Sequence, residues 1–255
     1  MDPNISEYRE VQADEILARI EEGRCAEYDH ISVLGDLDLS KINLINKDKK
    51  KLVGPKIRIA SSEVQGFLGF ADSTFQSPVS FRETTFRGDI DFWEAHFLKD
   101  ADFWGAKFCG DVNFWDAHFE GIANFTEAEF SKNADFIMAR LEFGAELWKA
   151  VFAGDASFWG ACFRGAGNFW KARFCGYADF RISSFDEDAN FADAVFEKNA
   201  DFLMANFAGA ASFTGAQFYG TADFRKAEFS SATRFRDATF RDQLDLMRAK
   251  LPGYR

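Results

Sequence analysis

The stretch ADFWGAKFCGDVNFWDAHFEGIANF, residues 101–125, contains the pattern that determines the fold. Its phenylalanines stand at positions 103, 108, 114, 119 and 125, separated by alternating steps of five and six residues. The alternation runs without a break from Phe70 to Leu251, with leucine replacing phenylalanine at a few steps. Neither a helix, with a period of about 3.6 residues, nor an alternating strand produces this spacing. The sequence therefore predicts a solenoid built from short repeats.

A second set of residues accompanies the phenylalanines. A small residue lies two positions before most of them, as Ala101 precedes Phe103 and Ala106 precedes Phe108. In extended backbone, positions i and i−2 point to the same side, so we expect both sets to face the interior. The residue between them, such as Asp102, then faces outward and is often Asp or Asn. Such short polar side chains bond local backbone groups at tight corners.

These A-(D/N)-(L/F)-x-x units resemble those of the pentapeptide-repeat proteins. Matching stretches include ADFWG at 101–105 and ADFIM at 134–138, and the resemblance covers residues 57–251. It implies an all-β fold, a right-handed quadrilateral β-helix with four short sides per coil and phenylalanines stacked along its axis.

The sequence departs from the plain five-residue repeat by a sixth residue at every second corner, which predicts about 22 residues per coil. The longer corners often contain glycine, as at Gly110, Gly176 and Gly220. We expect a left-handed backbone or a small bulge there. A flattened two-sided coil of half that length is the rival geometry. We predict the four-sided coil, because inward phenylalanines fit a square section better than a flat one.

We expect one domain in three parts: an N-terminal cap at 1–56, the β-helix at 57–251 and a tail at 252–255. Residues 11–22 predict a short amphipathic capping helix that ends at Gly23. Aliphatic residues between Ile31 and Leu44 follow the same spacing and predict a starter coil. The lysine-rich segment 47–51 is typical of a solvated loop.

Composition excludes several classes of protein. The 32 phenylalanines provide ample apolar surface to bury, which excludes intrinsic disorder. The chain has no apolar run of the length that a transmembrane helix needs, and its N-terminus does not resemble a secretory signal. Four cysteines make no disulfide framework, so we expect a cytoplasmic protein. The net charge of −11 argues against direct nucleic-acid binding.

No motif for catalysis or for a cofactor stands out, and we expect no enzyme, no catalytic residues and no cofactor. The Asp and Asn residues recur at every coil, whereas an active site is a local exception to its scaffold. His96 and His118 are one predicted coil apart and therefore neighbours in one column. We find no third ligand in register with them, so we interpret them as surface histidines rather than a metal site.

Tryptophan is concentrated at one repeat position, directly after the inward apolar residue that follows a six-residue step. Residues one coil apart form columns, which predicts two candidate interaction faces on opposite sides of the rod. One consists of Trp93, Trp115, Ile137 and Trp159, and the other contains Trp104, Trp148 and Trp170 together with Thr126. Exposed aromatic rows mark a partner-binding surface. The alternative is that the rings stack along the ladder and stabilise it.

The repeat ends at Leu251 without a capping helix, so the last coil exposes apolar side chains and unpaired strand edges. The candidate dimer end consists of Leu244, Leu246, Met247 and Leu251. We predict a non-enzymatic scaffold or protein-interaction module that forms a homodimer through this coil, as the resemblance also implies. The alternative is a DNA-mimic regulator that binds DNA gyrase, as some similar acidic rods do. A lesser alternative is the soluble portion of a membrane-associated protein, given the basic residues near the C-terminus.

Overall fold

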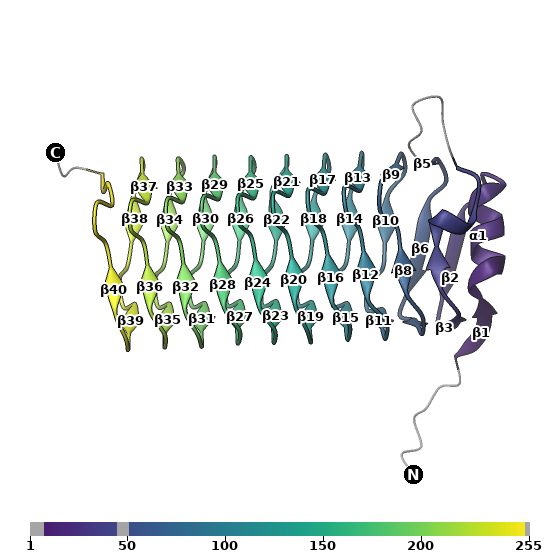
Figure 1. Ribbon diagram of the computed structural model, residues 1–255, viewed down its shortest axis with the longest axis horizontal. Coiled ribbons are helices and arrows are strands. Elements are labelled where there is room, and N and C mark those ends of the chain that lie inside the picture. Colours follow the sequence, from purple (N-terminus) through teal and green to yellow (C-terminus); the bar gives the residue numbers. More distant parts are fainter. Residues whose placement is uncertain (1–7, 45–50, 253–255) are drawn as a thin grey trace, which may run out of the picture.

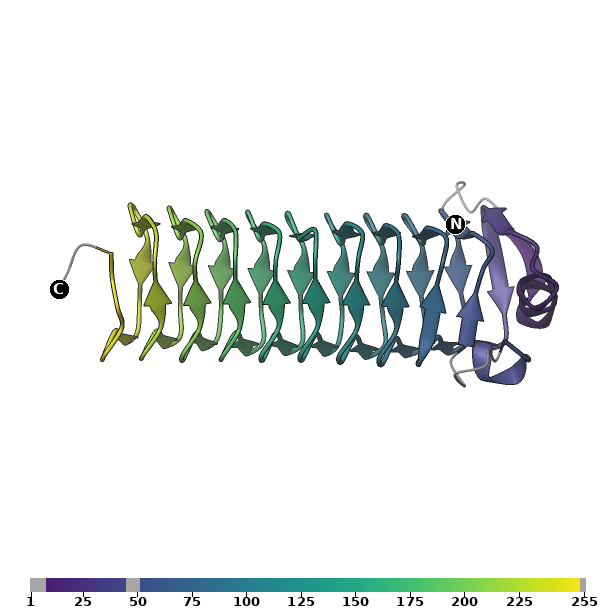
Figure 2. The same ribbon diagram turned by 90° about the horizontal axis from the view of Figure 1, so that it is seen from above.

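The computed structural model describes residues 8–44 and 51–252, which form a rod of stacked coils (Figures 1 and 2). Four parallel sheets of eleven, ten, ten and nine strands run along the rod. We name them A, B, C and D. Each coil visits them in the order B, A, C, D. Sheet B therefore faces sheet C, and sheet A faces sheet D, across the interior.

Most strands are only two residues long. Sheet A contains β1 (Arg9–Gln12), β3 (Ile31–Leu34), β7 (Glu63–Val64), β11 (Thr85–Phe86), β15 (Lys107–Phe108), β19 (Glu129–Phe130), β23 (Val151–Phe152), β27 (Arg173–Phe174), β31 (Val195–Phe196), β35 (Gln217–Phe218) and β39 (Thr239–Phe240). Sheet B contains β2 (Ala26–Asp29), β6 (Ile57–Ala60), β10 (Val79–Ser80), β14 (Ala101–Asp102), β18 (Ala123–Asn124), β22 (Ala145–Glu146), β26 (Gly167–Asn168), β30 (Ala189–Asn190), β34 (Ala211–Ser212) and β38 (Thr233–Arg234).

The other two faces have the same build. Sheet C contains β4 (Leu37–Asp38), β8 (Leu68–Gly69), β12 (Ile90–Asp91), β16 (Val112–Asn113), β20 (Ala134–Asp135), β24 (Ala156–Ser157), β28 (Ala178–Asp179), β32 (Ala200–Asp201), β36 (Ala222–Asp223) and β40 (Leu244–Asp245). Sheet D contains β5 (Lys51–Val53), β9 (Ser73–Phe75), β13 (His96–Phe97), β17 (His118–Phe119), β21 (Arg140–Leu141), β25 (Cys162–Phe163), β29 (Ser184–Phe185), β33 (Asn206–Phe207) and β37 (Glu228–Phe229).

The strand register confirms the four-sided coil. Ala101 pairs with Ala123 in sheet B, and Phe97 pairs with Phe119 in sheet D. Each residue therefore pairs with the equivalent residue of the next coil, four sides further along the chain, and the coil has the length that the sequence predicts. The flattened two-sided coil is wrong.

The core consists of the phenylalanines and the small residues that precede them. Phe103 and Phe125 are fully buried and stack with ring centroids 4.9 Å apart and planes 2° apart. Across the interior, Phe103 meets Phe114 edge to face at 5.7 Å. Stacked rings along each sheet and edge-to-face rings between sheets fill the section of the rod. The predicted phenylalanine ladder is confirmed.

The short corners explain the outward Asp and Asn residues. Asp91 Oδ1 accepts a hydrogen bond from the backbone N–H of Trp93 at 2.9 Å. Ala95 N–H then donates to the carbonyl oxygen of Phe92 at 3.0 Å, which closes a turn around Glu94, whose φ is 51°. The left-handed residues of the short corners are mostly not glycine.

The expected left-handed backbone is wrong for Gly110, Gly176 and Gly220, none of which has a positive φ, although Gly144 at another long corner has a φ of 89°. A Cβ added to Gly110 would instead lie 2.5 Å from the carbonyl oxygen of Gly88 in the preceding coil. Glycine is used there because adjacent coils approach closely.

A capping helix covers the first coil (Figure 1). α1 spans Ala13–Glu21 rather than residues 11–22, because Val11 is buried and belongs to β1, which pairs with β3. The helix buries Ile16, Leu17 and Ile20 and ends before Gly23, whose φ is 71°.

The aliphatic starter coil is present. A short 3-10 helix, η1 (Leu39–Lys41), follows β4, and the sheets continue into the repeats without a break because β2 pairs with β6. Most of the lysine-rich segment predicted as a loop lies outside the described residues, as do residues 253–255 of the tail.

Candidate interaction surfaces

The two tryptophan columns lie at diagonally opposite short corners. One follows sheet C, where the turn places Trp93, Trp115 and Trp159 just before the left-handed residue. The other follows sheet B and contains Trp104, Trp148 and Trp170. The same turn therefore places both sets, but their surroundings differ.

Cations cover the tryptophans at the corner after sheet B. Arg82 lies over Trp104 with its Cζ 4.6 Å from the ring centroid. Lys149 lies 4.4 Å from Trp148, and Lys171 lies 4.7 Å from Trp170. Trp148 and Trp170 also stack with centroids 5.8 Å apart. These contacts favour the interpretation that this column stabilises the ladder.

The corner after sheet C has an uncovered apolar surface. Trp115 is 46% exposed, and its ring lies 6.0 Å from that of Trp93 at an angle of 32°. Within residues 8–44 and 51–252, no Lys or Arg lies over a tryptophan of this corner. The apolar row continues at the left-handed position of the same turn, where Met138, Ile182 and Met204 are 40–49% exposed.

We call this surface the corner ridge. It consists of Trp93, Trp115, Ile137, Met138, Trp159, Ile182, Leu203 and Met204. The sequence analysis identified four of these residues. It missed Leu203, which continues the same column beyond Arg181, and it missed Met138, Ile182 and Met204, which form a second column one residue further along each turn.

The last coil is open at the C-terminal end of the described residues. Leu244 and Leu246 are each 37% exposed, Met247 is 57% exposed, and Leu251 is half-buried. Phe235 and Phe240 are also only partly buried, whereas Phe213 and Phe218, one coil earlier, are fully buried. Among the described strands, β40 pairs with β36 alone, so its other edge has no strand partner there.

The two histidines form a cluster with glutamates on sheet D. His96 and His118 pair in register, and their rings stack with centroids 4.5 Å apart and planes 6° apart. His96 Nε2 lies 3.0 Å from Glu120 Oε1, and His118 Nε2 lies 3.1 Å from Glu142 Oε1. In the straight column Thr74 and Arg140 flank the pair, and the third donor, Glu120, lies off that column. Each glutamate lies 24 residues after its histidine, a diagonal offset that the search of straight columns missed.

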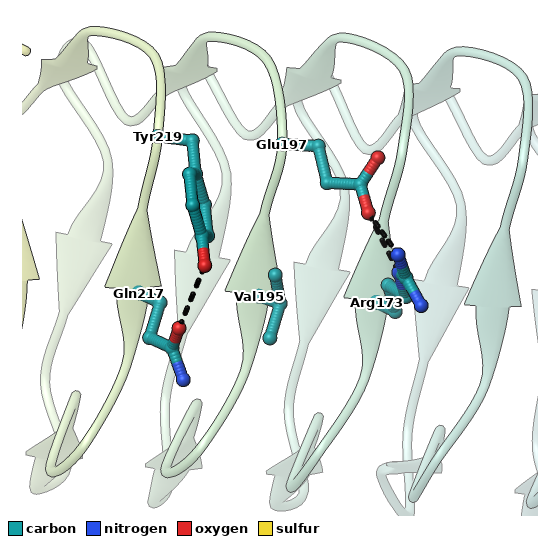
Figure 3. Close-up of a pocket in the computed structure, with 5 residues that line it drawn as sticks. All are labelled: Arg173, Val195, Glu197, Gln217 and Tyr219. Carbon is teal, nitrogen blue, oxygen red and sulfur yellow. Dashed lines mark hydrogen bonds and ion pairs between the residues drawn. The ribbon is translucent and has the colours of Figure 1, made fainter. Parts of the chain in front are cut away.

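A surface hollow of about 500 Å³ lies on sheet A (Figure 3). Val195 forms its floor between two polar walls. Tyr219 Oη donates to Gln217 Oε1 at 3.1 Å on one side, and Arg173 Nε donates to Glu197 Oε1 at 2.7 Å on the other. These five lining residues contain no pair of nucleophile and base. Burial raises the pKa of the neighbouring Cys175 thiol, so this cysteine is not activated.

Acidic side chains follow sheet C. A hollow of about 450 Å³ is lined by Asp89, Asp91, Asp111 and Asp135 together with six other residues. Burial raises the pKa of Asp135, although the backbone N–H of Ile137 opposes this.

Further along sheet C, arginines neutralise the row of acids. Arg181 pairs with Asp179 at 2.7 Å, and Arg225 pairs with Asp223 at 2.6 Å. In the N-terminal half of this face, Lys132 lies 3.9 Å from Asp89 and 4.0 Å from Asp111, so the row of acids is only partly neutralised there.

The fold is that of a parallel β-solenoid with an internal phenylalanine ladder. A comparison with known families matches nine copies of pentapeptide repeats over residues 61–107, 114–161 and 213–250. These segments cover more than half of the chain, which belongs to the pentapeptide-repeat family. No curated protein and no solved structure matches the chain in the other two comparisons. Among the described residues, no helix has the length and apolar character needed to cross a membrane.

Proposed function

We propose that this protein is a non-enzymatic interaction module that pairs end to end with a second copy through its last coil. The observation that carries the proposal is the contrast between the two ends of the rod. α1 buries the first coil, whereas Leu244, Leu246 and Met247 of the last coil are exposed beside the unpaired edge of β40. An open sheet edge with apolar neighbours is a template for strand pairing.

A second copy suits this end for two reasons. A twofold axis across the rod brings the two last coils together with their strands antiparallel, so each edge supplies the partner that the other lacks. The coil also carries both signs of charge, including Arg236 paired with Asp237 at 3.2 Å, and Arg241 and Asp242 nearby. A surface with both signs is complementary to its own copy.

The decisive experiment measures solution mass by light scattering and shape by small-angle X-ray scattering. We expect a dimer about twice as long as one rod. Leu246→Asp with Leu251→Asp should produce a monomer with unchanged β-sheet circular dichroism. The matched control, Trp115→Ser with Met204→Ser on the corner ridge, should remain a dimer. A monomeric parent protein, or a dimer abolished only by the ridge variant, would contradict end-to-end pairing.

The corner ridge is the surface that we assign to a protein partner. It supports this role because Trp115 is 46% exposed and, among the described residues, no Lys or Arg lies over a tryptophan of this corner, whereas the tryptophans of the opposite corner lie under cations. The four free cysteines suit a reducing compartment, which supports a cytoplasmic location for that partnership.

The second candidate function is a DNA-mimic regulator that binds DNA gyrase. The acidic patch of Asp89, Asp91, Asp111 and Asp135 favours it, because a row of carboxylates resembles a row of phosphates in charge. A gyrase supercoiling assay tests it. Inhibition that is relieved by Asp89→Asn with Asp111→Asn would support this function, and unaltered supercoiling would exclude it.

A further inference from the structure

The histidine cluster on sheet D has the donor atoms of a metal site. The inward phenylalanines of β13 and β17 direct His96 and His118 outward, one above the other. Glu120 lies two residues after His118 and therefore projects from the same face. One ring nitrogen of each histidine and a carboxylate oxygen of Glu120 all lie within 4.8 Å of one another.

The spacing requires only a small side-chain movement to bind an ion. Ligand atoms about 2.0–2.2 Å from a tetrahedral zinc ion lie roughly 3.3–3.5 Å apart. The side chains of His96 and His118 are 28% and 27% exposed, so they sit at the surface and are not locked in the core. A hollow of about 260 Å³, lined by His118, Glu120, Glu142 and Phe143, adjoins them and has space for an ion and water.

The two glutamates, Glu120 and Glu142, differ in whether a permanent cation already pairs with them. Glu142 is already paired with Arg164, whose Nη1 lies 3.1 Å from Oε2. Within residues 8–44 and 51–252, no Lys or Arg forms an ion pair with Glu120, whose charge is therefore not offset by a permanent cation. This difference assigns Glu120 to the ion and Glu142 to an outer position beside His118.

We propose that His96, His118 and Glu120 bind one divalent transition-metal ion, with water completing the coordination. Two imidazoles and one carboxylate suit Zn²⁺, and the same set accepts Co²⁺, Ni²⁺ and Cu²⁺. Coordination replaces the contacts of His96 Nε2 with Glu120 and of His118 Nε2 with Glu142, and each imidazole binds through Nε2 as a neutral ligand. Because the ligands come from two successive coils, the ion links those coils and stabilises the folded chain.

The test uses the full chain without an affinity tag. Co²⁺ titration followed by visible absorption reports coordination geometry, and Zn²⁺ titration calorimetry reports stoichiometry. We expect one ion per chain. His118→Gln should abolish the cobalt spectrum, and Glu120→Gln should weaken Zn²⁺ binding by more than the roughly 10- to 100-fold cost of losing an outer partner.

Two matched controls separate this site from other donors. His30→Gln changes the remaining histidine, which lies in the cap, and Glu129→Gln changes an outward glutamate on the opposite sheet A. Both should bind the metal as the parent protein does. Thermal unfolding without metal verifies that each variant folds, and added Zn²⁺ should raise the melting temperature of the parent and both controls only.

Three results would overturn the proposal. The first is the absence of Zn²⁺ and Co²⁺ binding by the parent protein. The second is unchanged binding by folded His118→Gln and Glu120→Gln proteins. The third is binding that persists in these variants but disappears when the four cysteines become serine, which would assign the ion to the thiols.

Discussion

Phe180 and Phe202 lie face to face in the core, with ring centroids 4.9 Å apart and planes 3° apart. Phe180 also meets Phe169 and Phe191 edge to face, at 5.4 and 5.3 Å. Each ring is therefore supported along the rod by its own column and across it by the facing column. This double support makes the phenylalanine ladder the main source of stability.

Removing one central ring should be costly. We expect Phe180→Ala to lower the free energy of unfolding by about 3–5 kcal/mol, because the coils above and below hold the cavity open. Phe180→Leu should cost less than about 1.5 kcal/mol, since Leu147 already occupies an equivalent place in the ladder of sheet B. Denaturant unfolding measures both. Phe240→Ala, in the partly exposed last coil, is the control and should cost less than Phe180→Ala; equal costs would contradict the ladder as described.

Asp135→Asn should stabilise the protein at neutral pH. Burial raises the pKa of Asp135, so its carboxylate opposes folding once the pH exceeds that pKa. Asparagine keeps an oxygen that accepts the hydrogen bond from Ile137 N–H, and it carries no charge. Asn113 occupies the equivalent position one coil earlier, and its side-chain amide donates to Asp91 Oδ1 at 3.0 Å. We expect a gain of a few tenths of a kcal/mol, because solvent screens partly exposed charges.

The pH dependence distinguishes this effect from general packing. The advantage of Asp135→Asn should shrink as the pH falls and the parent carboxyl becomes protonated. Asp223→Asn is the opposite control. Burial acts to raise the pKa of Asp223, but hydrogen bonds from the Arg225 side chain and backbone outweigh it and lower the pKa. This carboxylate therefore stabilises the fold above its unfolded pKa. Its replacement should destabilise at neutral pH, with the loss vanishing in acid; the same pH profile for both variants would refute the assignment.

Ile182→Asn should also raise the free energy of unfolding, by about 0.5–1 kcal/mol. Ile182 has a φ of 60° and is 49% exposed, and a β-branched residue is strained in left-handed backbone that asparagine tolerates. Ile122→Asn is the matched control, since Ile122 is 48% exposed but has no positive φ. Urea unfolding compares the two. A gain at Ile122 equal to that at Ile182 would show that exposure, not backbone strain, is responsible.

Ile182 also belongs to the corner ridge. The left-handed conformation recurs at other short corners, and what distinguishes Ile182 is the exposed apolar side chain at that position. The prediction of an interaction face from Trp93, Trp115 and Trp159 remains to be tested. The two corners share their turn and differ in their surroundings, because Lys149 and Lys171 cover the rings of the other corner.

The sequence by itself determined the repeat of this protein. Alternating steps of five and six residues indicated which residues face inward and favoured a coil of four sides over a flattened coil of two. The strand register, which pairs Phe97 with Phe119, decided for four sides. The same spacing indicated which residues face outward, including both tryptophan columns and His96 above His118.

The tertiary structure alone decided which outward side chains meet. His96 contacts Glu120, His118 contacts Glu142 and Arg173 contacts Glu197, each diagonally across 24 residues rather than straight along a column. These diagonal pairs depend on side-chain length and rotamer, which the repeat period does not constrain. The left-handed turns at non-glycine residues were equally hidden, because the stacking of whole coils imposes them against local preference.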